Sequence, residues 1–163
     1  MYPCPCGYFS DTQKPCTCAP AVVTKYQKRI SGPLLDRIDI HIEVPRVDYE
    51  KLSNDRVGES SASIRQRVQA ARERQRARFS KNGSLDIVCN ADMRVGEIRQ
   101  FCKLQDEGHS LMRAAMTQLN LSARAYHRIL KLARTIADLV GSEEIQSVHL
   151  AEALQYRPKM MLS

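Results

Sequence analysis

Residues 121–140 read LSARAYHRILKLARTIADLV, the most regular helical pattern in the chain. Ser122 is a favourable N-cap for this helix, and Gly141 marks its end. Apolar side chains recur at helical spacing and define the face predicted to be buried: Ile129, Leu132, Ala133, Ile136 and Val140. The pattern predicts a helix over 123–140 that packs against other helices.

The sequence on either side of this segment is mostly helical in pattern as well. Further helices are predicted over 21–30, 61–79, 94–103, 107–119 and 148–155. Ser147 is the N-cap expected for the last of them. The helix at 61–79 has an apolar stripe into which one glutamine falls: Ile64, Val68, Ala71, Gln75 and Phe79. The fold class is therefore mainly α, with a small bundle of about four helices after residue 85.

One segment has the pattern of a strand. Residues 38–44, IDIHIEV, alternate strictly between apolar and polar side chains before Pro45. Because a lone strand is not stable, we expect it to belong to a sheet whose other strands are absent from this sequence. The sequence thus divides into an arm over 1–45, a polar linker and connecting helix over 46–84, and a helical domain over 85–163.

Composition restricts the class of protein. The chain has 163 residues, 43% hydrophobic and 26% charged, which is typical of a globular protein rather than a disordered one. No apolar run approaches the roughly 20 residues of a membrane span, and the N-terminus lacks a secretory signal. We therefore expect a cytoplasmic protein without membrane contact. The net charge of +7 favours an anionic partner, either nucleic acid or phosphate.

Four of the six cysteines lie within the first 18 residues, as the pairs Cys4/Cys6 and Cys16/Cys18. Four thiolates can bind zinc tetrahedrally, and a site with four protein ligands is structural rather than catalytic. The usual spacing places two residues between paired cysteines, whereas here there is one. Reduced structural thiols are the alternative interpretation.

Basic side chains occur in three places, each with two interpretations. In SGPLLDRID, residues 31–39, Arg37 either pairs with a neighbouring aspartate or reaches a phosphate across a subunit interface. Arg124, in the first turn of the 123–140 helix, shares a face with Arg128 and Lys131. This face is either solvated or binds an anion, since the helix dipole disfavours a lone cation there. The arginine-rich helix at 61–79 either follows phosphates or is solvated.

Sequence motifs for catalysis are absent from this chain. It contains no G-x-x-x-x-G-K-[ST] phosphate-binding loop, and its four histidines have neither metal nor catalytic-triad spacing. We therefore expect that this chain does not hydrolyse ATP by itself.

Several separated blocks resemble one known family. They are PCPCGYFSD (3–11), CTCAP (16–20), YQKRISGPLLDRIDIHIEVPRV (26–47), LNLSARAYHRILKLARTIADL (119–139) and HLAEALQYRP (149–158). Together they closely resemble the magnesium-chelatase-like AAA+ ATPases of the ComM/YifB group. The resemblance implies that the chain is the last third of such a protein. It makes 1–45 the edge of an incomplete α/β P-loop ATPase core and the region from residue 85 a helical lid.

The resemblance also implies roles for particular residues. Arg37 matches the arginine finger, which reaches the γ-phosphate of ATP bound by the neighbouring subunit. Arg124 matches the sensor-2 arginine of the lid, which contacts the γ-phosphate within its own subunit or across the interface, and Arg128 joins it as a nucleotide-binding residue. Tyr2 stands where the family has the sensor-1 asparagine, so that role is not transferred.

The implied cofactor is ATP with Mg²⁺, bound only by the full-length protein. The implied assembly is a homo-oligomeric ring, a hexamer, which drives branch migration of DNA. Two alternatives stay open. The first is a basic nucleic-acid-binding module stapled by zinc, without ATPase activity. The second is the motor subunit of a magnesium chelatase that acts on tetrapyrroles, although no residue pattern favours this function over the remodelling of DNA.

Overall fold

The computed structural model describes residues 2–35, 37–42, 44, 47, 58–81 and 86–157. The chain divides into two compact units. The N-terminal unit comprises Met1–Ile38 and Ile42–Asn54, and the C-terminal unit comprises Asp39–His41 and Asp55–Ser163. Most of the linker predicted between 46 and 60, and part of the region after the helix at 61–79, lie outside the described residues.

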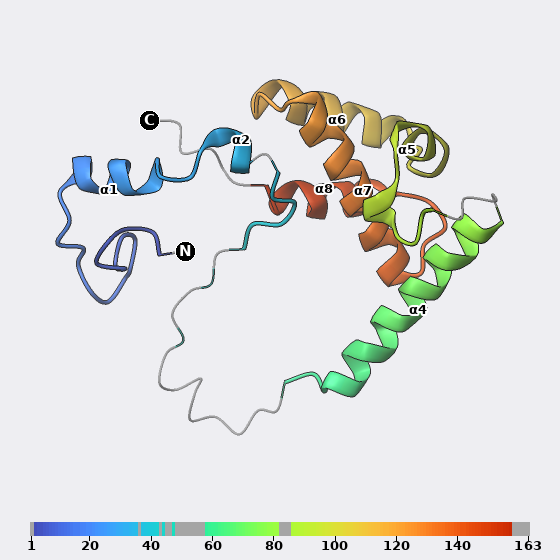
Figure 1. Ribbon diagram of the computed structural model, residues 1–163, viewed down its shortest axis with the longest axis horizontal. Helices are drawn as coiled ribbons and strands as arrows, with labels where there is room; N and C mark the ends of the chain where they lie inside the picture. The colour runs from blue at the N-terminus through green and yellow to red at the C-terminus, as the bar shows by residue number, and fades with distance from the viewer. Residues whose placement is uncertain are drawn as a thin grey trace. The chain divides into compact units, whose positions relative to one another are not determined.

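The described residues of the N-terminal unit form helix α1 over Pro20–Gln27 and the single turn α2 over Gly32–Leu35 (Figure 1). Pro20 suits the first turn of α1, because its fixed φ is helical and its missing N–H would have no partner there. The Gln27 Nε2 donates a hydrogen bond to the Pro3 carbonyl oxygen at 3.1 Å. Helix α1 is therefore tied to the cysteine-rich start of the chain.

The C-terminal unit is a helical bundle built around α7. Its helices are α4 Ser61–Ser80, α5 Val95–Phe101, α6 Asp106–Gln118, α7 Ala123–Val140 and α8 Ser147–Gln155, with a 3₁₀ turn at Asn90–Asp92. Helix α7 packs against α4, α5, α8 and the 3₁₀ turn, and α6 packs against α8 (Figure 1). The mainly helical fold class is confirmed. Among the described residues, no helix combines the length and the apolar character needed to span a membrane.

Helix α7 begins and ends as its sequence predicts. The Ser122 Oγ accepts a hydrogen bond from the Ala125 N–H at 3.2 Å, and Gly141 ends the helix with φ of +82°. A side chain at Gly141 would be strained by this φ and would also approach the Arg74 guanidinium to 3.1 Å. Of the face predicted to be buried, Ile129, Ala133 and Ile136 are buried and Leu132 is partly buried, whereas Val140, the last residue of the helix, is exposed.

The hydrophobic core of the C-terminal unit surrounds this face. Its buried members are Phe79, Ile87, Met93, Ile98, Cys102, Met112, Ile129, Leu130, Ala133, Ile136, Ala137, Ile145, Leu150 and Ala153. Burial raises the pKa of the Cys102 thiol to about 12, so this cysteine is a protonated, apolar part of the core.

Helix α8 begins differently from the prediction. Its N-cap is Gln146, and Ser147 is already the first helical residue. The Gln146 N–H donates to the His149 Nδ1 at 3.1 Å, so a side chain of the first turn reaches back to the N-cap backbone. Burial lowers the pKa of His149, which keeps the ring neutral and its Nδ1 able to accept this bond.

The predicted strand at 38–44 is wrong for its described residues, which form no strand. Ile38, Ile40, Ile42 and Val44 are all exposed instead of lying on a buried sheet face. An alternating pattern forms a strand only beside a partner, and no described segment provides a second strand. The His41 N–H instead donates to the Tyr156 carbonyl oxygen at 2.8 Å, just after the end of α8.

The apolar stripe predicted along α4 is buried over only half of its length. Ala71, Gln75 and Phe79 are buried, whereas Ile64 and Val68 are 41% and 39% exposed. The prediction that the last two belong to the core is therefore wrong, because only the C-terminal half of α4 lies against α7. Figure 1 shows the N-terminal half of α4, in green, extending away from the rest of this unit.

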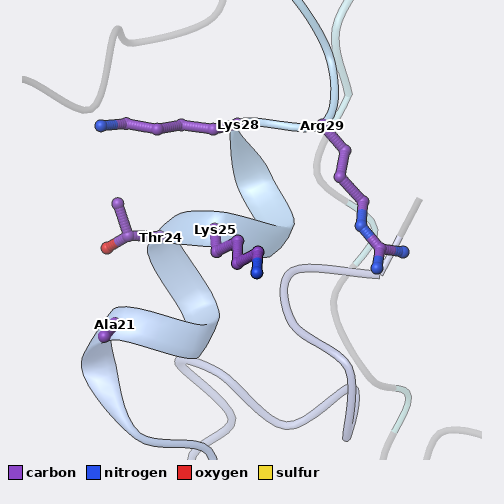
Figure 2. A pocket seen from close by; sticks show the side chains of 5 residues that line it. All are labelled: Ala21, Thr24, Lys25, Lys28 and Arg29. Atoms are coloured by element: carbon purple, nitrogen blue, oxygen red, sulfur yellow. The ribbon is translucent and has the colours of Figure 1, made fainter.

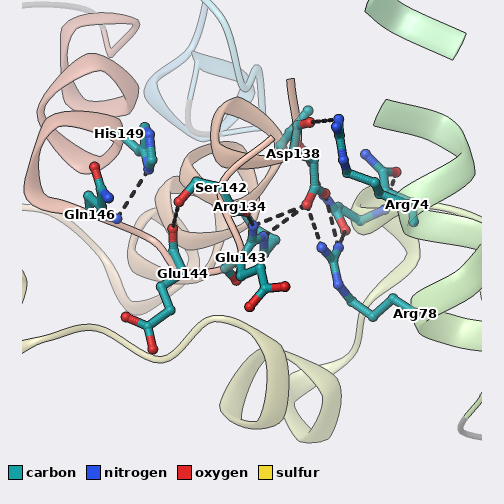
Figure 3. Close-up of polar contacts among 12 residues, drawn as sticks. Arg74, Arg78, Arg134, Asp138, Ser142, Glu143, Glu144, Gln146 and His149 are labelled. Carbon is teal, nitrogen blue, oxygen red and sulfur yellow. Dashed lines mark hydrogen bonds and ion pairs between the residues drawn. The ribbon is translucent and has the colours of Figure 1, made fainter. Parts of the chain in front are cut away.

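A buried ionic network fixes α4 on α7. The Asp138 carboxylate is fully buried and forms ion pairs with Arg78 and Arg134 (Figure 3). Its Oδ2 accepts from the Arg78 Nη1 at 2.9 Å and from the Asn90 Nδ2 at 2.8 Å. The Arg134 Nη2 lies 3.1 Å from the Asp138 Oδ1. Burial lowers the pKa of Arg134, and the Asp138 carboxylate opposes that effect.

Backbone carbonyls complete the network. Arg74 donates to the Asp138 carbonyl at 2.8 Å, and Arg134 donates to the carbonyls of Ser142 at 2.6 Å and Glu143 at 2.7 Å (Figure 3). The Gln75 Oε1 accepts from the Asn90 N–H at 3.1 Å, which explains a glutamine on the buried stripe of α4. Arg74, Gln75 and Arg78 of α4 therefore contribute to the folding of this unit.

Candidate functional site

The four N-terminal cysteines lie together in the N-terminal unit. All four sulfur atoms lie within 4.8 Å of one another. The Sγ of Cys4 is 3.3 Å from that of Cys6 and 3.7 Å from that of Cys16, and the Sγ atoms of Cys6 and Cys16 are 3.5 Å apart. Tetrahedral zinc with Zn–S distances of 2.3 Å requires sulfurs about 3.8 Å apart. The four side chains therefore fit a tetrathiolate zinc site.

Local backbone geometry gathers these thiols. The Gly7 N–H donates to the Cys4 carbonyl at 3.0 Å, which closes a turn around the first pair of cysteines. Gly7 has φ of +84°, and a Cβ atom there would also lie 3.3 Å from the Tyr2 ring. Only glycine adopts this conformation without strain. A second turn, in which the Asp11 carboxylate accepts from the N–H groups of Gln13 and Lys14, returns the chain toward Cys16.

Hydrogen bonding makes the thiols chemically unequal. The Tyr8 N–H, with a smaller effect from the Cys4 side chain, lowers the pKa of Cys6 to about 5. The Cys18 N–H favours the thiolate form of Cys16 and so lowers its pKa. Burial and the hydrogen bonds to the neighbouring sulfurs have the larger combined effect, and they raise the pKa of Cys16 to about 12. Hence Cys6 is a thiolate at neutral pH, which is the form that ligates a metal.

The exposed side of α1 carries basic side chains. A hollow of about 610 Å³ is lined by residues of α1 and of the turn that follows it (Figure 2): Ala21, Thr24, Lys25, Lys28 and Arg29. Because all of its lining comes from one short stretch of chain, the hollow is an open, basic surface rather than an enclosed cavity.

Arg37 lies just after the short helix α2 and is exposed. Its Nη1 donates to the Pro33 carbonyl at 2.8 Å, so part of the guanidinium is held against α2. Asp39, one of the two aspartates considered as its partner, instead forms an ion pair with Arg128 of α7, with Nη1 and Oδ1 2.8 Å apart.

The three cations predicted on one face of α7 have different surroundings. Arg128 is paired with Asp39, and the Lys131 Nζ donates to the Ala91 carbonyl at 2.7 Å. Arg124 is exposed in the first turn, next to the Ser122 cap, and makes no hydrogen bond or ion pair with the residues that the structure describes. Of these three, Arg124 is thus the one whose guanidinium is available to an outside anion.

The candidate residues are distributed over both units. The cysteine cluster and Arg37 belong to the N-terminal unit, and Arg124 and Arg128 belong to the C-terminal unit. Within the C-terminal unit, Arg128 holds Asp39, which stands two residues after Arg37 in the chain.

Sequence reasoning missed the buried pair of Arg134 and Asp138. Both residues are buried although, at 100° per residue, they lie about 140° and 180° around α7 from Ile129, on the side opposite the predicted apolar face. Their spacing of four residues, which places opposite charges on one helix face, was the signal that could have revealed the pair.

Comparisons with known proteins agree with this organisation. A family model described as magnesium chelatase, subunit ChlI C-terminal, matches residues 58–157, and one described as magnesium chelatase, subunit ChlI, matches residues 1–52.

Individual relatives match nearly the whole chain. The competence protein ComM of Haemophilus influenzae is 43% identical over 164 residues, which cover 99% of this chain and 30% of the relative. The uncharacterized protein YifB of Escherichia coli is 44% identical over 158 residues, which cover 96% of this chain and 29% of the relative. YifB of Salmonella typhimurium is 39% identical, with the same two coverages.

The chain thus spans about 30% of the length of these relatives. The C-terminal family model alone covers most of the sequence, including all of the helical bundle. This chain therefore belongs to the magnesium-chelatase-like family of AAA+ ATPases, as a C-terminal portion similar to the ComM/YifB group.

Proposed function

We propose that this chain is the C-terminal part of a ring-forming ATPase, to which it contributes an arginine finger and a sensor-2 arginine. The observation that carries the proposal is the position of Arg124. It is an exposed cation in the first turn of α7 and has no partner among the described residues. A cation there is opposed by the helix dipole, and an anion bound at the same end removes that conflict.

Arg124 is proposed to contact the γ-phosphate of ATP. A guanidinium already aimed at the position where charge develops stabilises the transition state of phosphoryl transfer. Arg128 is proposed as a second nucleotide-binding residue on the same helix. In the described structure its Nη1 pairs with the Asp39 carboxylate, so this pair would have to open for Arg128 to bind a phosphate.

Arg37 is proposed to act on the nucleotide of the neighbouring subunit. Its backbone follows the turn α2, and its Nη1 is steadied by the Pro33 carbonyl at 2.8 Å. A guanidinium carries five N–H donors in a planar fork that matches the geometry of phosphate oxygens.

The partners proposed for the full-length protein are further copies of itself in a hexameric ring, with DNA as the polymer on which the ring acts. The net charge of +7 supports an anionic partner. We also propose a cytoplasmic location. The cofactor is ATP with Mg²⁺, which this chain alone has no phosphate-binding loop to hold.

A magnesium chelatase motor subunit is the second candidate, because both matching family models carry that description. The two candidates predict different activators of ATP hydrolysis. The first predicts stimulation by DNA, and the second predicts stimulation by a tetrapyrrole together with partner subunits.

Substituting Arg124 tests the proposed nucleotide contact. In the full-length protein, Arg124→Ala is expected to lower ATP turnover by about 100-fold while ring assembly persists, because one preorganised donor to the transition state is lost. Turnover is measured by phosphate release, and assembly by analytical ultracentrifugation. Arg113→Ala, which removes an exposed arginine of α6, is the matched control and should leave turnover unchanged. Unchanged kinetics in Arg124→Ala would remove the sensor-2 assignment.

Zinc is proposed as a structural ion held by Cys4, Cys6, Cys16 and Cys18. The support is the fit of the sulfur separations to a tetrathiolate site. When bound, the ion would crosslink the two cysteine pairs and leave no open coordination position for catalysis.

Metal analysis tests the zinc site. Protein purified under reducing conditions is expected to contain one zinc ion per chain, and Cys4→Ser is expected to lose most of it, since Cys4 is a fully buried member of the cluster. Cys89→Ser, which changes a cysteine outside the cluster, should retain the metal. Elemental analysis gives the stoichiometry. A protein that takes up no zinc when zinc is supplied would favour the interpretation as reduced structural thiols.

A further inference from the structure

Helix α4 carries six arginines, and the structure divides them into two groups. Three are occupied by other parts of the fold. Arg67 forms a two-pronged contact with Glu59, at 3.0 and 3.2 Å. Arg74 and Arg78 bind the backbone and the side chain of Asp138. These three arginines stabilise the C-terminal unit or the start of α4.

The other three, Arg65, Arg72 and Arg76, are exposed. Within the part of the chain that the structure describes, none of them makes a hydrogen bond or an ion pair. At 100° per residue, steps of seven and four residues place them within about 40° of one another around the helix, and they span about 16 Å along it. The three unpaired arginines therefore form a single straight stripe.

No acidic side chain of α4 neutralises this stripe. Glu73 is the single carboxylate between Ser61 and Ser80, and its Oε1 accepts a hydrogen bond from the Gln69 Nε2 at 3.2 Å. An exposed helix usually pairs its arginines with carboxylates one turn away. Here such pairs are missing where the stripe lies, so its positive charge is directed at a partner outside the helix.

We propose that Arg65, Arg72 and Arg76 form a binding surface for the phosphate backbone of duplex DNA. The inference rests on the proposed function, because it names the surface by which the full-length protein would hold its DNA. Guanidinium groups bind phosphate oxygens through two parallel hydrogen bonds. The stripe is as long as the rise of about five base pairs, so its arginines can bind successive phosphates.

The surroundings of the stripe favour duplex over single-stranded DNA. Proteins that hold single strands stack the bases on exposed aromatic rings. Phe79 is the single aromatic residue of α4, and it is 1% exposed. In the N-terminal half of α4, Ile64 and Val68 are also exposed, so the bundle does not cover this part of the helix. A long ligand such as duplex DNA needs an uncovered surface of this kind.

Neutralising the stripe tests the inference. The full-length protein with Arg65→Gln, Arg72→Gln and Arg76→Gln is titrated into a labelled 30-base-pair duplex at several salt concentrations. We expect binding to weaken at least tenfold, and the slope of log K against log salt to shrink by about 2 to 3 in magnitude. ATP turnover without DNA should stay unchanged. The variant with lysine at the same three positions should keep the salt slope, because it keeps the charge.

A second triple variant controls for the change in net charge. It removes three exposed cations from α5, α6 and the residues between these helices: Arg99→Gln, Lys103→Gln and Arg113→Gln. This region also contains carboxylates, at Glu97, Asp106 and Glu107. The loss of the three cations should reduce affinity by less than threefold. Equal losses in the two glutamine variants, or duplex binding unaffected by the first, would overturn the inference and leave the proposed function in place. If the unaltered protein binds no duplex, the DNA part of the proposed function fails, and this inference fails with it.

Discussion

The full-length protein carrying Arg37→Ala is expected to bind ATP normally but to hydrolyse it at least about 1,000-fold more slowly. An arginine finger contributes about 10³- to 10⁵-fold to turnover, because it stabilises the charge that develops during phosphoryl transfer. Arg37 is exposed, and its Nη1 donates to the backbone carbonyl of Pro33. Because substitutions of exposed side chains usually change stability little, the loss of activity should come without a comparable loss of stability.

Two further variants isolate the chemistry of Arg37. Arg37→Lys retains the charge but not the planar fork, so we expect turnover to stay at least tenfold below that of the unaltered protein. Arg29→Ala, which removes an exposed arginine of the same unit, should behave like the unaltered protein. Phosphate release measures turnover, and a fluorescent ATP analogue measures binding. Near-normal turnover in Arg37→Ala would refute the finger assignment.

Asp138→Ala is expected to destabilise the C-terminal unit by about 3–5 kcal/mol. The carboxylate is fully buried and compensates the positive charges of two guanidinium groups. The Arg134 side chain is 3% exposed, and the Arg78 side chain is 17% exposed. Without the carboxylate, two like charges face each other in the core with no anion to pair them. The Asn90 amide also loses its acceptor at Asp138. Urea unfolding of the chain, followed by circular dichroism, measures the change in the free energy of unfolding.

A surface ion pair provides the control for Asp138. The side chains of Glu59 and Arg67 are 42% and 52% exposed, so Glu59→Gln should cost less than about 1 kcal/mol. Asp138→Asn keeps the shape of the side chain and should recover only part of the lost stability, because the charge is what the arginines require. If Asp138→Ala stays within 1 kcal/mol of the unaltered chain, the network does not have the structural role assigned to it.

The helices of the C-terminal unit could be predicted from local patterns. Helix α7 has a cap at Ser122, an end at Gly141 and a continuous apolar face, and each of these signals depends only on neighbouring residues. Helices α4, α5 and α6 begin and end within one or two residues of their predicted limits for the same reason. Helix α1 ends at Gln27, three residues before its predicted end.

Tertiary contacts could not be predicted in this way. The alternation at 38–44 describes a segment suited to a sheet, but a strand forms only when a partner strand is present. Ile64 and Val68 continue the apolar stripe of α4, yet no described element covers them. The partners of Asp138 come from α4, α7 and the 3₁₀ turn, so no single window of sequence contains the network.

The candidate site was accessible to sequence reasoning to different degrees. The cysteine pairs predicted one cluster, and the structure brings the four sulfurs within 4.8 Å of one another, although the bound metal stays a prediction. Arg37 and Arg124 rest on the family resemblance, since their spacing alone allows a solvated role. The pairing of Arg128 with Asp39 joins residues 89 positions apart, so it became visible only in three dimensions.

Subunit mixing tests the central claim most directly, namely that this chain lends Arg37 to the active site of a neighbouring copy. Full-length Arg37→Ala is mixed with a full-length variant that cannot bind ATP, and co-assembly is verified by affinity capture through a tag on one of them. We predict that the mixed rings hydrolyse ATP although neither variant does so alone, because an intact nucleotide site that borders an ATP-binding-deficient subunit meets an intact Arg37. Mixed rings that co-assemble and hydrolyse no more ATP than the separate variants would contradict it.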